Sequence, residues 1–433
     1  MFPYRGEQKL WVYLSVNLTV SSMTKVIFNL LQLKLLKWGK AAFWTATFLL
    51  CFSAVAVAKP NEVEPPNPLE ITTPDPLLPT PPLERPLTPL EQTNLREALD
   101  RLNEQAVAQF SAGNSIEAYK IWYREIRLRR VLGGPLEEVQ ALGRVGETAW
   151  SQNSKPEVQL ITARLEAIQK EAETKKTLDE PLLRALGRAY EQVRVPGQAL
   201  KVYEQILATE RQRNDPAAVE TTLKTIAQLH LAWFDYPKAA AAYEELLATA
   251  QAKGDRVNQL VYLKELINIY DKSKQPENAL RTKQQLVEKY LNEQDFTQIP
   301  SLKIAIAADY EALNQPEEAS QNYQEAYTLA FSSQQFAYAS DALLKLGNLY
   351  RSHSQPDFAL QVYDVLLKVE QQSYNYYGLM NAYDQIGQIH LEQKNYAQAL
   401  SAFQQGLELA KSLQYQESYF STQIERVNQQ SSQ

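Results

Sequence analysis

The sequence predicts an all-α protein built as a solenoid of about eight helix-turn-helix repeats. Three observations lead to this prediction. Alanine recurs every forty residues from Ala199 to Ala399, apolar side chains follow helical spacing from about residue 91 onward, and glycine is scarce, with 14 among 433 residues. A fixed period of this length is typical of arrays in which each helix pair packs only against its neighbours.

The composition argues against several classes of function. The chain carries 44 Lys and Arg against 50 Asp and Glu, a net charge of -6, so it offers no overall basic surface to a nucleic acid. One Cys and three His argue against a zinc site, a disulfide framework and a Cys-His nucleophile pair. We therefore expect no metal and no other cofactor.

Residues 1–58 are interpreted as an export signal. Four lysines precede an uncharged run from Ala41 to Ala58, and the run ends with small residues at Ala56 and Ala58 before Lys59. A charged region, an apolar region and an Ala-x-Ala site are the marks of a cleaved signal peptide. An uncleaved membrane anchor is the alternative, because the 18 residues of the run reach the lower limit for spanning a bilayer.

This interpretation places the rest of the chain in a periplasm or an equivalent exoplasmic lumen. Residues 1–22 make the approach to the apolar run long for a signal peptide, so Met23 is a second candidate for the true start. Residues 1–58 carry six Lys or Arg and one Glu, and the chain from Lys59 therefore has a net charge of -11. It would also lack cysteine, which suits an oxidising compartment.

A proline-rich, disordered linker is predicted at residues 59–90, which hold 11 of the 22 prolines and no aromatic residue. Such a segment buries too little apolar surface to offset the entropy lost on ordering. We expect a semi-rigid spacer, which would extend by roughly 3 Å per residue as a polyproline II helix. A ligand for a proline-reading groove is the alternative, because Pro-x-x-Pro recurs in the segment.

The forty-residue register defines a unit of two helices within residues 91–415. Each repeat alanine is followed four residues later by a ring or a lysine, and a ring or histidine stands nine residues before it. Prolines such as Pro196 and Pro276 mark the start of the second helix, because proline is tolerated in a first turn. Candidate N-caps near the start of the following units are Asp215, Asp255, Asp295 and Asn375.

Leu186-Gly187-x-x-Tyr190 in the first helix, followed by Ala199-x-x-x-Tyr203 in the second, resembles the tetratricopeptide repeat. The resemblance covers six clear units in residues 180–413, and two degenerate units precede them. It implies a right-handed solenoid whose concave face is lined by the first helix of each unit, with residues 416–433 as a capping helix and polar tail. The family period is about 34 residues, and we expect the additional residues of this chain at the junction between units, around residues 211–217.

The resemblance also indicates which side chains would face a partner. The fifth family position of the first helix carries a cation in four successive units and then apolar residues, and the ninth position carries mostly amides. The predicted groove residues are Arg144, Arg184, Arg188, Lys224, Gln228, Lys264, Asn268, Ile304, Leu344 and Asn348. Such a strip would attract a carboxylate-rich extended segment. The alternative is that these cations are simply good formers of exposed helix.

Two hypotheses of function follow. The first is a non-enzymatic scaffold or assembly factor of the cell envelope that holds an extended protein partner in its groove. The second is a carrier of an acidic envelope polymer such as a polysaccharide, which would need aromatic rings beside Arg184 and Lys224. Neither involves a nucleic acid, and a membrane is involved only through an uncleaved N-terminal segment.

We expect no enzymatic activity, because no Ser-His-Asp arrangement and no glycine-rich loop after a strand is recognisable in the sequence. The three histidines are too few and too scattered to suggest a catalytic cluster, and two of them occupy the ring column of the repeats. A group of tyrosines, Tyr374, Tyr376 and Tyr377, is expected to pack between helices, with a role as interface anchors as the alternative.

Overall fold

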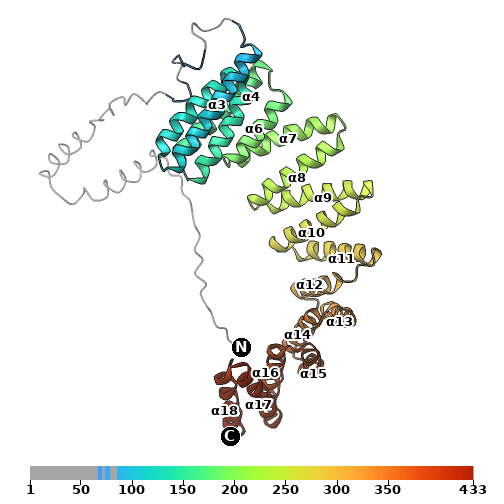
Figure 1. The fold of residues 1–433 in the computed structure, drawn as a ribbon. Helices are drawn as coiled ribbons and strands as arrows, with labels where there is room; N and C mark the ends of the chain where they lie inside the picture. Colours follow the sequence, from blue (N-terminus) through green and yellow to red (C-terminus); the bar gives the residue numbers. More distant parts are fainter. Residues whose placement is uncertain (1–66, 71–73, 79–84, 433) are drawn as a thin grey trace, which may run out of the picture. The chain divides into compact units, whose positions relative to one another are not determined.

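A computed structural model describes residues 67–70, 74–78 and 85–432, and Figure 1 labels its helices. These residues contain sixteen helices and no strand, which confirms the all-α prediction. All sixteen helices belong to one compact unit, Pro68–Gln433. The predictions for residues 1–58, an export signal or anchor and a start at Met23, lie outside the described residues. None of the described helices combines the length and the apolar character that a bilayer-spanning segment needs.

The first two helix pairs share one long helix. Helix α3 (Pro89–Ser111) packs against α4 (Ser115–Ser151), and α5 (Lys155–Lys175) packs against α4 as well. Residues 133–134 interrupt the helical backbone of α4, where Gly134 has a φ of 66° that other residues rarely adopt. The first part of α4 therefore closes the first pair, and its second part opens the second pair.

Six regular pairs follow, in the register that the sequence predicts. In each pair we call the first helix A and the second helix B. They are α6 (Glu180–Gln192) with α7 (Pro196–Gln212), α8 (Pro216–Ala232) with α9 (Tyr236–Lys253), α10 (Arg256–Lys272) with α11 (Pro276–Asn292), α12 (Ile299–Ala312) with α13 (Pro316–Ser332), α14 (Phe336–Ser352) with α15 (Pro356–Gln372), and α16 (Tyr376–Glu392) with α17 (Tyr396–Leu413). Helix α18 (Glu417–Ser431) then packs against α17, where a capping helix is expected.

A turn of constant geometry ends every helix from α6 to α17. Its central residue is left-handed, with φ between 51° and 67°, and it recurs every twenty residues from Arg194 to Gln414. The forty-residue repeat thus consists of two halves of equal length. Because only residues 213–215 separate α7 from α8, the residues beyond the family period extend helices and form no loop.

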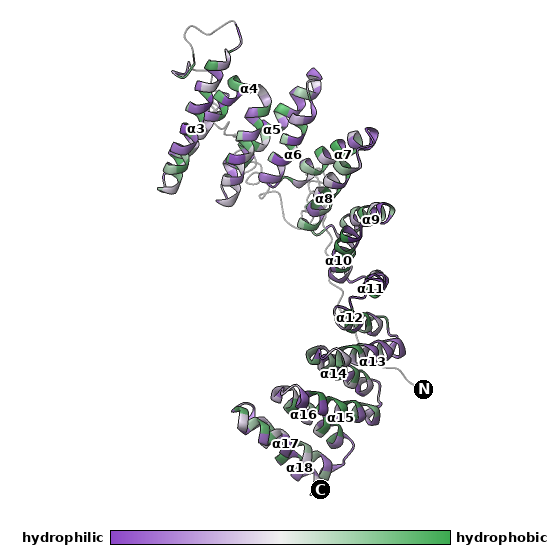
Figure 2. Cartoon of the chain, turned by 45° about the vertical axis from the view of Figure 1, so that its right-hand side comes forward, coloured by the Kyte–Doolittle hydropathy of each residue, from purple (hydrophilic) through white to green (hydrophobic). Residues whose placement is uncertain are grey.

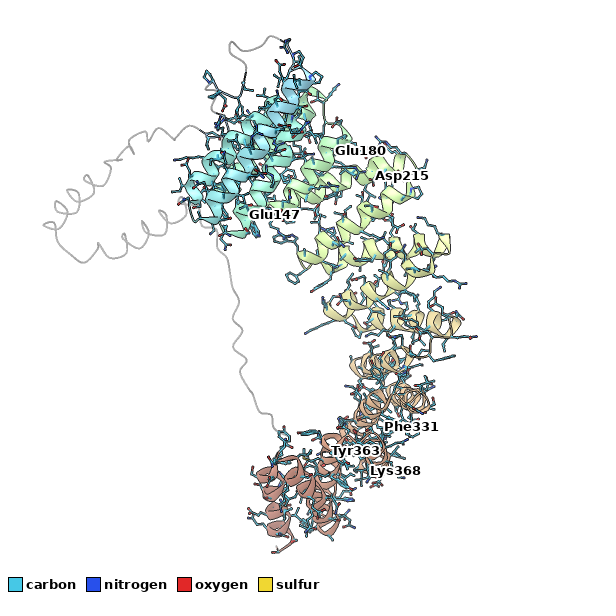
Figure 3. The ribbon with its side chains drawn as sticks, viewed as in Figure 1. Glu147, Glu180, Asp215, Phe331, Tyr363 and Lys368 are labelled. Carbon is cyan, nitrogen blue, oxygen red and sulfur yellow. The ribbon has the colours of Figure 1, made fainter. Side chains whose placement is uncertain are left out.

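The repeat columns form the core within each pair. The repeat alanines Ala199 and Ala399 are fully buried, and so are rings such as Tyr363. A Cβ atom added at Gly347 of α14 would come within 2.3 Å of the Tyr363 ring of α15, which Figure 3 labels. The small residue in helix A therefore makes room for the ring of helix B, as the sequence predicts. Figure 2 shows hydrophobic and hydrophilic residues on different faces of the helices, as expected when one face is buried.

Three of the four predicted N-caps are confirmed, since first-turn N–H groups donate hydrogen bonds to the side chains of Asp215, Asp255 and Asn375. The fourth prediction is wrong. Asp295 accepts a hydrogen bond of 3.2 Å from the N–H of Thr297 in a turn, and α12 begins only at Ile299. Pro300 explains this late start, because a proline is tolerated in the first turn of a helix but not in its interior.

Part of the predicted spacer contacts the first repeats instead of extending freely. Leu69 is fully buried in the main core, and Arg124 of α4 donates two hydrogen bonds, of 2.7 and 2.8 Å, to Asp75. The expectation of a free spacer is therefore wrong for residues 68–70 and 74–78. A leucine between prolines can enter a core without regular secondary structure, and composition alone did not reveal this.

Candidate functional site

The predicted groove residues lie on successive A helices, from the second part of α4 to α14. Residues three and four positions apart share one helix face, so the family positions chosen from the sequence fall on one stripe. Most of these side chains are exposed or half-buried. We call the following eight the A-helix stripe: Arg184, Arg188, Lys224, Gln228, Lys264, Asn268, Leu344 and Asn348.

Two cations of the predicted strip bind buried carboxylates of the chain itself. Arg184 of α6 lies 2.6 Å from Glu210 and 2.8 Å from Glu180, which Figure 3 labels. Arg144 of α4 lies 2.8 Å from Glu125 in the same way. Glu125 and Glu210 are almost completely buried, and Glu125 also pairs with Arg129 at 3.1 Å. The arginines therefore neutralise charges that would be costly to bury alone.

A third cation is also paired. Lys224 of α8 lies 2.9 Å from Glu220, and its Nζ atom stands 5.4 Å from the centre of the Tyr262 ring. The hydrogen bonds from Lys224 and from the Tyr262 hydroxyl lower the pKa of Glu220 to about 2. The basic strip is therefore weaker than the sequence suggests, because three of its four fifth-position cations have internal partners.

Two cations of the A-helix stripe have no ion pair within the part of the chain that the structure describes. Arg188 is exposed on α6, one helical turn after Arg184. Lys264 is exposed on α10, with its Nζ atom 5.8 Å from the Tyr290 ring. These two side chains therefore offer positive charge to a partner.

Arg188 lines a hollow of about 410 Å³ between the second part of α4 and α6. The hollow has an apolar floor, and two guanidinium groups and two amides stand around it. Its lining residues are Leu136, Val139, Gln140, Pro181, Arg184, Ala185, Arg188 and Gln192. Such a surface suits an apolar side chain that is followed by a carboxylate.

Ile304 is not part of the accessible surface, although it occupies a predicted groove position. It is buried in a cluster with residues of α13 and α14, such as Ala319 and Leu346. The cause is the packing of α12, which contacts α14 as well as α13. The predicted apolar continuation of the groove is thus reduced to Leu344, which is half-buried.

Two exposed valines on α10 are absent from the predicted groove residues. Val257 and Val261 are 73% and 46% exposed and stand four residues apart. They precede Lys264 and Asn268 at helical spacing, so apolar, cationic and amide groups follow one another along this helix. The signal was present in the sequence as two valines at i and i+4 on the outer face of a helix.

The tyrosine group near α16 is exposed, so the expectation that it packs between helices is wrong. Tyr374 is 77% exposed because it is the left-handed residue of a turn, and Tyr376 and Tyr377 open α16 with about half of their surfaces exposed. The Tyr377 ring meets Tyr415 edge-on, with 5.8 Å between ring centres.

The described residues hold no group of three His, Cys, Asp or Glu that could bind a metal ion. His230 lies in the core near Asp235, and burial lowers the pKa values of His230 and His390. Both histidines occupy the ring column, as expected.

Comparisons with known proteins agree with the repeat pattern. Family models described as tetratricopeptide repeat match residues 182–217 and 338–412. A comparison with curated proteins finds no match.

Similar solved structures include BtubC from P. vanneervenii, which is 18% identical, with 51% of this chain and 92% of that chain covered and a TM-score of 0.35. Aspartyl phosphate phosphatase F from Bacillus subtilis is 16% identical, with 66% and 78% covered and a TM-score of 0.38. The nearly identical TPR-like repeats from Podosopora anserina are 16% identical, with 44% and 94% covered and a TM-score of 0.33. The two family matches, together with the helix pairs and their forty-residue columns, show that the chain contains tetratricopeptide repeats, as the sequence predicts.

Proposed function

We propose that the chain is a non-enzymatic protein-interaction scaffold of the cell envelope that holds an extended acidic segment of a partner against its A helices. The observation that carries the proposal is the hollow between α4 and α6. An apolar side chain of the partner would fill the hollow, and an adjacent carboxylate would pair with Arg188. A charge-assisted bond to a guanidinium group is strong and directional, so this end would fix the register of the segment.

The remaining A-helix stripe suits the rest of an extended segment. The exposed amides of Gln228 and Asn268 can each donate and accept hydrogen bonds, so they fit a peptide backbone of any sequence. On α10, Lys264 offers a second cation beside Val257 and Val261. The alternation of these groups favours a partner that carries both carboxylates and apolar side chains.

A protein partner is favoured over an acidic polysaccharide. Binding of a sugar chain beside the cations would need exposed rings, and the rings nearest to Lys224 and Lys264 are those of Tyr262 and Tyr290. These two residues are only 1% and 5% exposed. The two rings can therefore stabilise the lysines by cation-π contacts but are too buried to stack on a sugar.

What supports the envelope location is the sequence of residues 1–58, with lysines before an apolar run and the small residues Ala56 and Ala58 at its end. Secretion of a reporter protein fused after Lys59, compared with a fusion that lacks residues 41–58, tests this part of the proposal. A reporter exported equally by both fusions would contradict it.

Affinity capture from an envelope extract tests the binding proposal. The baits are the unchanged protein, an Arg188→Glu/Lys264→Glu variant and a Lys201→Glu control on α7. Arg184 and Lys224 are left unchanged, because their loss would remove a cationic partner of Glu210 and of Glu220 and would weaken the fold.

We expect the double variant to bind the partner about tenfold more weakly or worse, because two charge-assisted hydrogen bonds are replaced by charge repulsion. The Lys201→Glu control should retain the partner, since Lys201 lies on a B helix. Equal capture by the double variant and the unchanged protein would contradict the proposed site.

A further inference from the structure

Residues 68–70 and 74–78, which we call the strap, lie against the B-helix side of the first two pairs. The strap contains no helix or strand. Within the strap, the N–H of Leu78 donates a hydrogen bond of 3.0 Å to the carbonyl of Asp75. Contacts with the side chains of α4 and α5, and not regular secondary structure, therefore hold the strap in place.

Three arginines of α4, spaced three residues apart, donate hydrogen bonds to the strap. Arg124 donates two hydrogen bonds to the carboxylate of Asp75, at 2.7 and 2.8 Å. Arg127 donates to the backbone carbonyl of Pro68, and Arg130 donates to the carbonyl of Leu69 at 3.0 Å. Recognition of backbone carbonyls together with a carboxylate is the way in which a peptide ligand is bound.

Two further contacts complete this recognition. The Leu69 side chain is fully buried in the main core and serves as the apolar anchor. The carboxylate of Glu70 lies 3.1 Å from Arg164 of α5 and 3.5 Å from Arg130. The helices therefore contact three successive residues of the strap: the carbonyl of Pro68, the buried side chain of Leu69 and the carboxylate of Glu70.

The strap does not fill the face on which it lies. A hollow of about 630 Å³ adjoins Pro68 and is lined by Ile116, Tyr119 and Tyr123, among other residues. Ile116 is three-quarters exposed there, and the buried hydroxyl of Tyr119 has no hydrogen-bond partner in the described part of the chain. A second hollow, of about 330 Å³, is lined by Arg130 and Arg164. The face can therefore accommodate a longer segment than the strap.

We propose that this face of α4 and α5 is a second peptide-binding site, which the strap occupies in the structure and which binds a Pro-Leu-acid segment of a partner protein in exchange for the strap. The strap is then an intramolecular ligand that blocks the site until a partner displaces it. This site lies on B helices and is independent of the A-helix stripe, so either proposal can fail without the other.

A peptide competition experiment tests the exchange. In the full chain, Leu69→Asp/Asp75→Lys releases the strap, because it places a carboxylate in the core and a lysine opposite Arg124. The probe is a fluorescent peptide with the sequence of residues 66–79, and its binding is followed by anisotropy. We expect the released variant to bind the peptide at least about tenfold more tightly than the unchanged chain, because only there is the site free.

Two controls locate the binding. Arg124→Glu added to the released variant should abolish binding of the peptide, and Arg188→Glu/Lys264→Glu added to it should change nothing. A released variant that keeps its helical circular dichroism but fails to bind the peptide would overturn the proposal. So would equal binding by the released variant and the unchanged chain.

A second measurement decides the matter if the released variant does not fold. Leu69→Cys is introduced into the full chain with Cys51→Ala, and the rate at which the buried thiol reacts is measured at low urea concentrations. An exchangeable strap opens locally, so the rate should not change with urea below the unfolding transition. A rate that rises in parallel with global unfolding would show that the strap is an integral part of the core.

Discussion

Lys283 shows how one residue can depart from a repeat column and still suit the core. It occupies the position that holds a ring in most other units, and it is almost completely buried. Its Nζ atom lies 2.7 Å from Asp271 and 2.9 Å from Asp309. The sequence shows a lysine four residues after a repeat alanine, where the other clear units have a ring. Its partners stand on other helices, 12 and 26 residues away, and no local pattern predicts them.

Removal of the Lys283 charge should therefore destabilise the folded protein. We expect Lys283→Met to lower the free energy of unfolding by about 3–5 kcal/mol, because it leaves the buried Asp309 carboxylate without its partner. Lys283→Met/Asp309→Leu should recover most of this loss, since it removes both charges. Urea unfolding of the two variants measures the difference, and a single variant as stable as the unchanged protein would contradict the assignment.

Glu220 gives a prediction about pH. Its pKa is lowered from 4.5 to about 2 by hydrogen bonds from Lys224 and Tyr262. Because the pKa in the folded state lies below that of the unfolded state, the stabilisation by the Glu220 carboxylate is complete above about pH 4.5 and is lost as the pH falls toward about 2.

The difference in thermal stability between the unchanged protein and Glu220→Gln should thus be constant from neutral pH to about pH 5 and should shrink below it. A difference that stays constant from neutral pH down to about pH 3 would show that the Glu220 pKa is not lowered.

At the scale of the elements, the turns and prolines explain where the helices begin and end. Pro196, Pro276, Pro316 and Pro356 each open a B helix, as the positions of these prolines in the sequence predict. The turn that recurs every twenty residues was harder to predict. Its left-handed position holds residues as different as Arg194, Phe234 and Tyr374, and glycine occupies it only at Gly254 among the turns from Arg194 to Gln414.

Substitutions at this position test the turn. We expect Phe234→Gly to raise the free energy of unfolding by about 1 kcal/mol, because glycine adopts a positive φ without strain and the Phe234 side chain is largely exposed. Gly254→Ala should lower it by a similar amount. Thermal unfolding of both variants is the measurement, and shifts of the same sign would contradict the common geometry.

The glycine that faces a ring gives a prediction about helix packing. Gly347→Ala should destabilise the protein by about 1–3 kcal/mol, since the added Cβ would overlap the Tyr363 ring. Gly197→Ala on α7 is the matched control, because a Cβ atom there meets no neighbour within 4 Å. Equal effects of the two substitutions would show that α14 and α15 are less closely packed than the structure indicates.

At the scale of the whole molecule, the sequence contained most of the architecture and less of the candidate site. Periodic columns report which residues share a helix face, and eight helix pairs follow from them. The pairing of Arg184 with Glu210 depends on how two neighbouring helices turn toward each other, which a column does not report. The burial of Ile304 and the docking of Leu69 likewise depend on contacts between separate elements.

Site-specific crosslinking can show whether a protein partner lies along the A helices. A photoreactive amino acid replaces Gln228 of α8 in one variant and Gln205 of α7 in a matched control, and both side chains are exposed. We expect a crosslinked partner from position 228 and none from position 205. Crosslinking from position 205 alone, or equally from both positions, would contradict it.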